Sequence, residues 1–206
     1  SFIEKPASDL EHFIAGEGGA KETIQTGRFN IINGGMIDLY QGMKKSIKCE
    51  WPNVEIHELL HVFGFNHSTN KNSIMYPYLE NCNQKIDVFI IEELKRLYSE
   101  ENLPDLYFEE ASATKKGRYL DFNFSVKNSG SIDSPIVNFS VLDNGHLVES
   151  RMLGNSEIKY GAGIFIDIKN LKLLRRDSKE ITFIIDKENT IKEIDKNNNI
   201  IKINFD

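Results

Sequence analysis

The sequence has few cysteines: Cys49 and Cys82 are the only two among 206 residues. Two are too few for a disulfide framework, which excludes the small scaffolds that depend on several bridges. They are expected either to form one bridge in an oxidising compartment or to stay as two buried thiols in a reducing one. With 40% hydrophobic residues, the chain can form one large domain or two small ones.

The sequence also lacks a long apolar run, a recognisable signal peptide and a basic patch. No apolar stretch is long enough for a membrane span, and the start at Ser1 predicts a mature or trimmed chain. The net charge of −6 is spread evenly, at −4 in residues 1–100 (10 basic minus 14 acidic) and −2 in residues 101–206 (15 minus 17). Nothing therefore favours nucleic acid or an anionic membrane as a partner.

The pattern before Pro104 predicts strands followed by helices in a domain over residues 1–103. Residues 1–5 are expected to form a short strand and residues 15–20 a flexible loop. Residues 29–40 alternate apolar and polar side chains around Asn33–Gly34–Gly35, which predicts a β-hairpin with its turn at the glycines.

Two helices are expected in the rest of this domain. The first lies between Pro52, which suits a first helical turn, and Gly64, which suits a left-handed cap. The second is amphipathic and covers residues 86–98, with Asp87 or a neighbour as its cap.

After Pro104 the apolar residues alternate with a period of two, which is typical of strands. Turn residues such as Asp143–Asn144–Gly145 separate some of the expected strands. The spacing predicts an all-β sandwich domain over residues 104–206. The expected strands are 106–112, 118–127, 135–143, 146–153, 162–168, 179–186 and 199–205.

The stretch HELLHVFGFNH at residues 57–67 carries the chemistry. His57 and His61 are four residues apart on a predicted helix, so both imidazoles face one zinc ion. Gly64 lets the chain reverse, so that His67 returns as the third ligand. Three protein ligands leave the fourth position open, which is typical of a catalytic site. Glu58 points elsewhere on the helix and can reach a zinc-bound water without binding the metal.

These roles predict hydrolysis of a peptide bond. Zinc lowers the pKa of its water to about 7. Glu58 takes the proton as the hydroxide attacks the scissile carbonyl, and it then passes that proton to the leaving amine.

The motif and the segment after it resemble the metzincin zinc endopeptidases. The family pattern is HExxHxxGxxH followed by a Met-turn, and Ser73–Ile74–Met75–Tyr76–Pro77 looks like that turn. The serine directly after the third histidine, Ser68, resembles the pattern of the matrixin branch. The resemblance implies that Met75 forms a hydrophobic floor beneath the ligands, and that Pro77 and Tyr78, with Leu79, line the pocket for the residue beyond the scissile bond.

The resemblance covers about residues 28–98 and has further implications. One strand before the helix is expected to pair with an extended peptide substrate. Family members normally carry a long helix and more strands upstream, so the 56 residues before His57 predict an N-terminally shortened or unusually small catalytic domain. A secreted protease favours a Cys49–Cys82 bridge across the site. Calcium in the Asp9–Glu22 region follows only from family analogy, since no ligand spacing supports it.

The second domain resembles the CARDB-type, immunoglobulin-like modules of prokaryotic cell-surface proteins. The resemblance lies in residues 184–199, IIDKENTIKEIDKNNN, where an apolar–Asp strand and an Ile–x–Glu step lead into an Asn–Asn turn. Turn chemistry explains the polar residues of this stretch better than a calcium site does.

The sequence as a whole predicts a secreted or cell-surface zinc endopeptidase, an α+β metzincin-like domain followed by an immunoglobulin-like sandwich. Two alternatives stay open at this stage. One is a cell-surface adhesion or binding protein with a relic metalloprotease domain, and the other is a zinc hydrolase that acts on a small amide.

Overall fold

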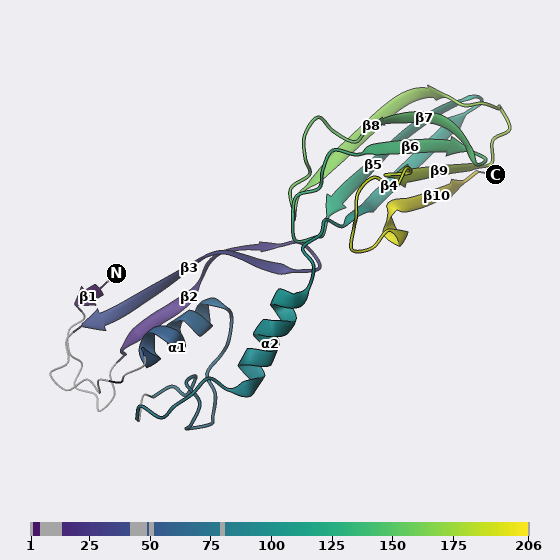
Figure 1. Ribbon diagram of the computed structural model, residues 1–206. Helices are drawn as coiled ribbons and strands as arrows, with labels where there is room; N and C mark the ends of the chain where they lie inside the picture. The colour runs from purple at the N-terminus through teal and green to yellow at the C-terminus, as the bar shows by residue number, and fades with distance from the viewer. Residues whose placement is uncertain (1, 5–13, 42–48, 50–51, 79–80, 206) are drawn as a thin grey trace. The chain divides into compact units, whose positions relative to one another are not determined.

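The computed structural model describes residues 2–4, 14–41, 49, 52–78 and 81–205, and it divides into two compact units (Figure 1). The first unit comprises residues 1–24 and 32–101, and the second comprises residues 25–31 and 102–206. Among the described residues, no helix is long and apolar enough to cross a membrane.

The first unit contains a three-stranded sheet with the order β1-β3-β2. Strand β1 (Phe2–Glu4) pairs parallel to β3 (Asn30–Gln41), with Phe2 opposite Leu39. Strand β2 (Gly16–Gln25) lies on the other side of β3 and forms an edge of the sheet. The short strand predicted at residues 1–5 is therefore confirmed.

The predicted loop over residues 15–20 and the turn at Asn33–Gly34–Gly35 are both wrong. The hairpin instead joins β2 to β3, and Thr26 closes it: its N–H donates to the carbonyl of Phe29, and its hydroxyl accepts from the N–H of Phe29. Gly27, at φ +95°, supplies the left-handed residue of this turn.

The Gly34–Gly35 pair lies inside β3, and its small size serves packing instead of a turn. A Cβ at Gly35 would stand 2.2 Å from Cγ1 of Val62, on the first helix. Glycine therefore lets the strand and the helix approach closely.

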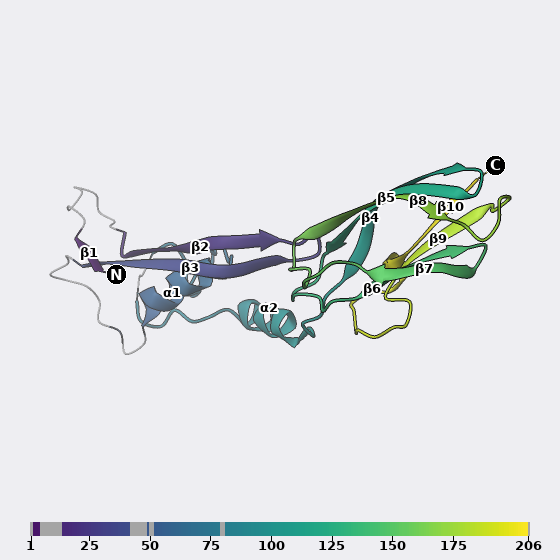
Figure 2. The same ribbon diagram turned by 90° about the horizontal axis from the view of Figure 1, so that it is seen from above.

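Both predicted helices form, and they enclose a small core. Helix α1 covers Asn53–Val62 and α2 covers Val88–Ser99, and Figures 1 and 2 show α1 lying along the β2–β3 hairpin. Gly64 adopts φ +88° just after α1, as expected. Asp87 precedes α2 but makes no capping hydrogen bond. Instead, it accepts a hydrogen bond from the hydroxyl of Ser73. The buried core residues are Leu60, Ile74, Met75 and Ile90.

The second unit is an all-β sandwich, and each of its seven predicted strands is present with shifted ends. One sheet has the order β4-β5-β8 and the other β10-β9-β6-β7. Asn144 and Gly145 both have positive φ in the turn between β6 and β7, as predicted from their residue types. The strands are β4 Leu106–Lys116, β5 Tyr119–Asn128, β6 Asn138–Asp143, β7 His146–Met152, β8 Gly163–Lys172, β9 Glu180–Ile185 and β10 Ile200–Asn204.

Aromatic rings join the two sheets of the sandwich. Phe122 on β5 lies 4.9 Å, between ring centroids, from Phe183 on β9, and Phe124 lies 5.1 Å from Phe139 on β6. All four rings are buried. Burial alternates along β5, so the period-two pattern that predicted this strand has its cause in this core.

Candidate metal centre

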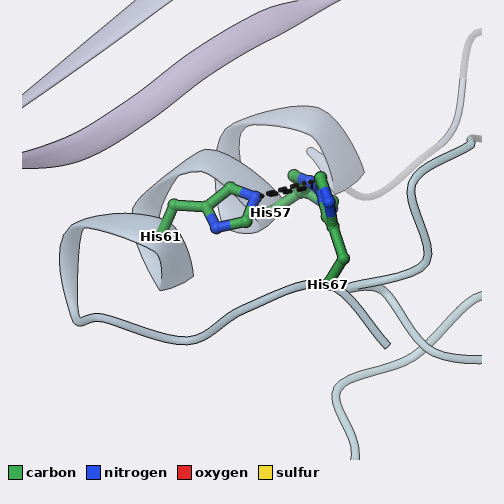
Figure 3. Close-up of side chains that lie close together, drawn as sticks. All are labelled: His57, His61 and His67. Atoms are coloured by element: carbon green, nitrogen blue, oxygen red, sulfur yellow. Dashed lines mark hydrogen bonds between the residues drawn. The ribbon is translucent and has the colours of Figure 1, made fainter. Parts of the chain in front are cut away.

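Three histidines converge where α1 ends and the chain reverses. His57 and His61 lie one turn apart on α1, and His67 follows the reversal at Gly64. The Nε2 atom of His61 lies 3.0 Å from Nε2 of His57 and 3.2 Å from Nε2 of His67, and the third side of the triangle is 3.3 Å. Figure 3 shows the three rings turned toward a common point.

Backbone carbonyls fix two of these rings. Nδ1 of His57 lies 2.7 Å from the carbonyl oxygen of Ile74, and Nδ1 of His61 lies 2.7 Å from that of Phe65. A carbonyl oxygen only accepts hydrogen bonds, so each Nδ1 carries the proton. The neutral ring then turns an Nε2 lone pair toward the other histidines, as a metal ligand does.

The histidine triangle fits a zinc ion. Lone pairs that face one another at about 3 Å repel unless a cation or a proton lies between them. Tetrahedral zinc with Zn–N bonds of ~2.0–2.1 Å places its nitrogen ligands roughly 3.3 Å apart, close to the separations observed. Within the described residues, this is the one group of three or more histidine, cysteine or acidic side chains close enough to share an ion.

The electrostatics favour the neutral, ligating form of the rings. Burial lowers the pKa of His57, whereas the hydrogen bond to the Ile74 carbonyl raises it. Positive charge on His61 or His67 would lower this pKa further. Burial and His61 likewise lower the pKa of His67. Both shifts favour the unprotonated form of these two rings.

Glu58 lies between the two helical histidines and is buried against strand β2. Burial raises the pKa of its carboxyl, and the nearby Glu17 adds to this, whereas His61 and a hydrogen bond from the Gly18 N–H oppose it. The side chain is thus a fixed carboxyl whose pKa is shifted toward neutrality, which suits proton transfer.

Strand β2 lies very close to α1 at Glu58. A Cβ at Gly16 would stand 2.9 Å from Cγ of Glu58, and a Cβ at Gly18 only 2.2 Å from its carbonyl oxygen. Real Cβ atoms essentially never approach so closely, so only glycine fits at Gly18 in this arrangement.

The segment of Met75 is tied to the surrounding structure. Met75 is buried, its N–H donates to the hydroxyl of Ser73, and its carbonyl accepts from Ser68, the residue after the third histidine. Pro77 and Tyr78 are exposed beyond this turn. Leu79 lies outside the described residues.

The cysteines form the predicted bridge. Cys49 and Cys82 are disulfide-bonded, with Cα atoms 5.3 Å apart and a sequence separation of 33. No cysteine is free. The bridge links Cys49, which precedes α1 in the sequence, to Cys82, which precedes α2.

In the stretch considered for calcium in the second domain, the carboxylate of Asp186 accepts hydrogen bonds from groups of the protein itself. Asp186 accepts hydrogen bonds from the N–H groups of Thr190 and Ile191, from the Thr190 hydroxyl and from the Lys196 ammonium. Turn chemistry therefore accounts for this carboxylate. Residues 9–13 of the first candidate calcium region lie outside the described residues.

Three parts of the site have no signature in the sequence. They are the carbonyls of Ile74 and Phe65 and the N–H of Gly18, all backbone groups. Any residue type carries such groups, so residue identity cannot reveal them. The glycines at 16 and 18 are an indirect signal for the third, because glycine permits close backbone contact.

Family models match both parts of the chain. The matrixin model matches residues 23–99, and the CARDB model matches residues 103–202. No match was found among curated proteins.

Two solved structures are similar to the second part of this chain. The CARDB domain of the PF1109 protein from Pyrococcus furiosus, in complex with di-metal ions, is 20% identical, with a TM-score of 0.40. The match covers 51% of this chain and 96% of that one. A domain of a protein from Methanosarcina acetivorans is 20% identical, with a TM-score of 0.41, over 48% of this chain and 88% of that one. Residues 23–99 are therefore similar to the matrixin family, and residues 103–202 are similar to the CARDB family.

Proposed function

We propose that the protein is a zinc-dependent endopeptidase of the matrixin-like metzincin type. The convergence of three Nε2 lone pairs, two of them fixed by carbonyls, carries this proposal. The matrixin match over residues 23–99 supports it independently. The disulfide supports a location outside the reducing cytosol.

The side chains divide the work between binding and proton transfer. His57, His61 and His67 would hold the zinc ion, which would supply Lewis acidity to polarise a scissile carbonyl and to acidify water. Glu58 accepts the proton that the attacking water loses as its oxygen bonds to the carbonyl carbon. The C–N bond then breaks, and the Glu58 carboxyl delivers that proton to the nitrogen of the leaving amine.

An extended peptide is the substrate that the sheet can bind. Strand β2 has β3 on one side and, among the described strands, no neighbour on its other side. Backbone groups at such an edge pair readily with an added strand. The same strand contacts Glu58 through Gly16 and Gly18, so a peptide paired with β2 would lie beside the carboxyl. Pro77 and Tyr78 are proposed to contact the residue beyond the scissile bond.

A second candidate is a cell-surface binding protein in which the metal centre has no proteolytic role. The CARDB match over residues 103–202 and the all-β sandwich favour it. In the protease proposal, the same domain serves as a spacer or positions the catalytic unit.

Cleavage of unfolded casein by the zinc-loaded full chain tests the proposal. Glu58→Gln keeps an oxygen that can accept from the Gly18 N–H, so it should fold and retain zinc while losing about 10²–10⁴-fold in rate. A zinc-loaded protein that cleaves nothing would favour the binding protein. Cleavage of small amides but not of peptides would favour the small-amide hydrolase.

A further inference from the structure

One end of the sandwich gathers positive charge that the sequence distributes over two segments. Residues 115–119 join β4 to β5, and residues 172–179 follow β8. The strand pairing brings them together, because Tyr119 is opposite Lys116 on one side and Lys172 on the other. We call the two segments the cationic tip; they contain one acid, Asp177. Their basic residues are Lys115, Lys116, Arg118, Lys172, Arg175, Arg176 and Lys179.

A shallow hollow lies within the cationic tip. Three of its lining residues are cations, and none is acidic. Tyr119 and Leu174 border it with about half of each side chain exposed, at 49% and 45%. The lining residues are Lys116, Gly117, Arg118, Tyr119, Leu174 and Arg176.

The hollow is held in shape by hydrogen bonds that leave cationic donors unused. Nε of Arg118 donates to the carbonyl of Leu173 at 2.6 Å, and one Nη donates to that of Leu174 at 2.9 Å. A guanidinium has five N–H donors, so Arg118 is fixed and still has N–H groups to offer. The buried carboxylate of Asp143 accepts from the N–H groups of Leu174 and Arg175, which fixes the opposite wall.

Two other cations of the hollow are available for a ligand. Lys116 and Arg176 are exposed, and within the described chain neither side chain has a hydrogen bond or ion pair. Gly117, at φ +63°, brings the turn close to Arg176, because a Cβ there would lie 3.6 Å from its Nε. Among the described residues, the three cations of the hollow thus have no carboxylate partner. Elsewhere on the sandwich, Lys127 pairs with Glu109 and Lys169 pairs with Asp167.

We propose that the cationic tip is a binding site for a phosphate group. A tetrahedral phosphate presents several oxygens, and Arg donates to such oxygens in fixed, charge-assisted pairs while Lys adds a point charge. Lys116, Arg118 and Arg176 bind the oxygens, and Tyr119 and Leu174 contact the group that carries the phosphate. The phosphate belongs either to a soluble phosphorylated polymer or to a lipid headgroup. This proposal is independent of the proteolytic function.

The test uses inorganic tripolyphosphate as the soluble probe and phosphatidylglycerol vesicles as the lipid probe, each with the full chain. We expect saturable backbone amide shifts at Lys116–Tyr119 and Leu174–Arg176 with the first probe, sedimentation with the second, or both. Neutralisation in Lys116→Gln/Arg176→Gln removes two charge-assisted contacts and should weaken binding at least about tenfold. Both residues are exposed, so an unchanged unfolding transition is expected.

The matched control is Lys127→Gln/Lys169→Gln, which removes the same charge from the same domain but outside the hollow. The affinity of this control variant for each probe should stay within about twofold of that of the parent. An equal loss in the control, equal sedimentation with phosphatidylcholine vesicles, or binding of neither probe would overturn the proposal. Binding of only one probe supports it and identifies the source of the phosphate.

Discussion

His57 and Ile74 are joined by a hydrogen bond of 2.7 Å from the ring Nδ1 to the backbone carbonyl. Ile74 directly precedes Met75, so the turn that contains the methionine orients the His57 ring through its backbone. Ser73 holds this turn, because its hydroxyl accepts from the Met75 N–H and donates to Asp87 beside α2. The helix, the turn and α2 therefore form one connected support for the histidine triangle, which is how outer groups commonly fix metal ligands.

The first prediction concerns the histidine triangle. His57→Ala or His61→Ala removes one of three converging lone pairs, and we expect tight zinc binding to be lost. Zinc content after dialysis against a weak chelator is the measurement. His146→Ala is the control, because His146 is exposed on β7 and should leave one zinc ion per chain. Unchanged zinc content in both helical variants would disprove the ligand assignment.

The second prediction compares two adjacent glycines of β2. Gly18→Ala places a Cβ 2.2 Å from the Glu58 carbonyl oxygen, whereas a Cβ at Gly19 meets nothing within 4 Å. Neither glycine has a positive φ, so the substitutions differ only in this contact. Gly18→Ala should cost about 1–3 kcal/mol of stability, as overpacking typically does, and should slow cleavage by displacing β2 from Glu58.

Gly19→Ala should leave both the unfolding free energy and the cleavage rate within error of the parent. Chemical denaturation measures the first effect whether or not the protein is a protease. If the two variants lose the same stability, the close approach of β2 to α1 is not the reason that position 18 requires glycine.

The sequence was most informative where local chemistry determines structure. The i, i+4 histidines, the cap at Gly64 and the alternation along β5 each follow from backbone geometry at a few neighbouring residues. Such patterns predicted the helices, the sandwich strands and the residues that now form the histidine triangle.

The sequence was misleading where a glycine could serve either a turn or a contact. Gly34–Gly35 has the composition of a hairpin turn, but Val62 of α1 lies against Gly35, and that contact comes from a distant part of the chain. The cationic tip was missed for a related reason. Its two segments are separated by more than 50 residues, so an even charge along the sequence hid a local excess created by strand pairing.

The third prediction concerns the disulfide. Cys49→Ser/Cys82→Ser should lower the stability of the first unit by about 3–4 kcal/mol, because the bridge restricts the unfolded chain over a 33-residue separation. Thermal unfolding of the variant should match that of the parent treated with reductant. Mass measurement after alkylation in denaturant without reductant gives the direct check, and two added groups would refute the bridge.

The fourth prediction concerns Asp186, which is 7% exposed. Burial alone would raise its pKa, but hydrogen bonds from Lys196, Thr190 and Ile191 outweigh burial and hold the pKa below its ordinary value. A lowered native pKa means that the unfolded chain binds the proton more readily. The carboxylate therefore stabilises the fold above its ordinary pKa of about 3.9, and this stabilisation is lost as the pH falls through the lower native pKa.

Asp186→Asn tests this dependence without backbone strain, because Asn also tolerates the φ of +48° found there. The amide nitrogen cannot accept hydrogen bonds, so we expect a loss of about 1–3 kcal/mol in the free energy of unfolding at pH 7. The difference from the parent should shrink in urea titrations at pH 3 and below, where the parent carboxylate is progressively protonated. Asp177→Asn, at an exposed position of the cationic tip, should change stability little at either pH. A deficit in Asp186→Asn that stayed constant from pH 7 to the acid limit would show that the hydrogen bonds of Asp186 stabilise the fold regardless of its charge.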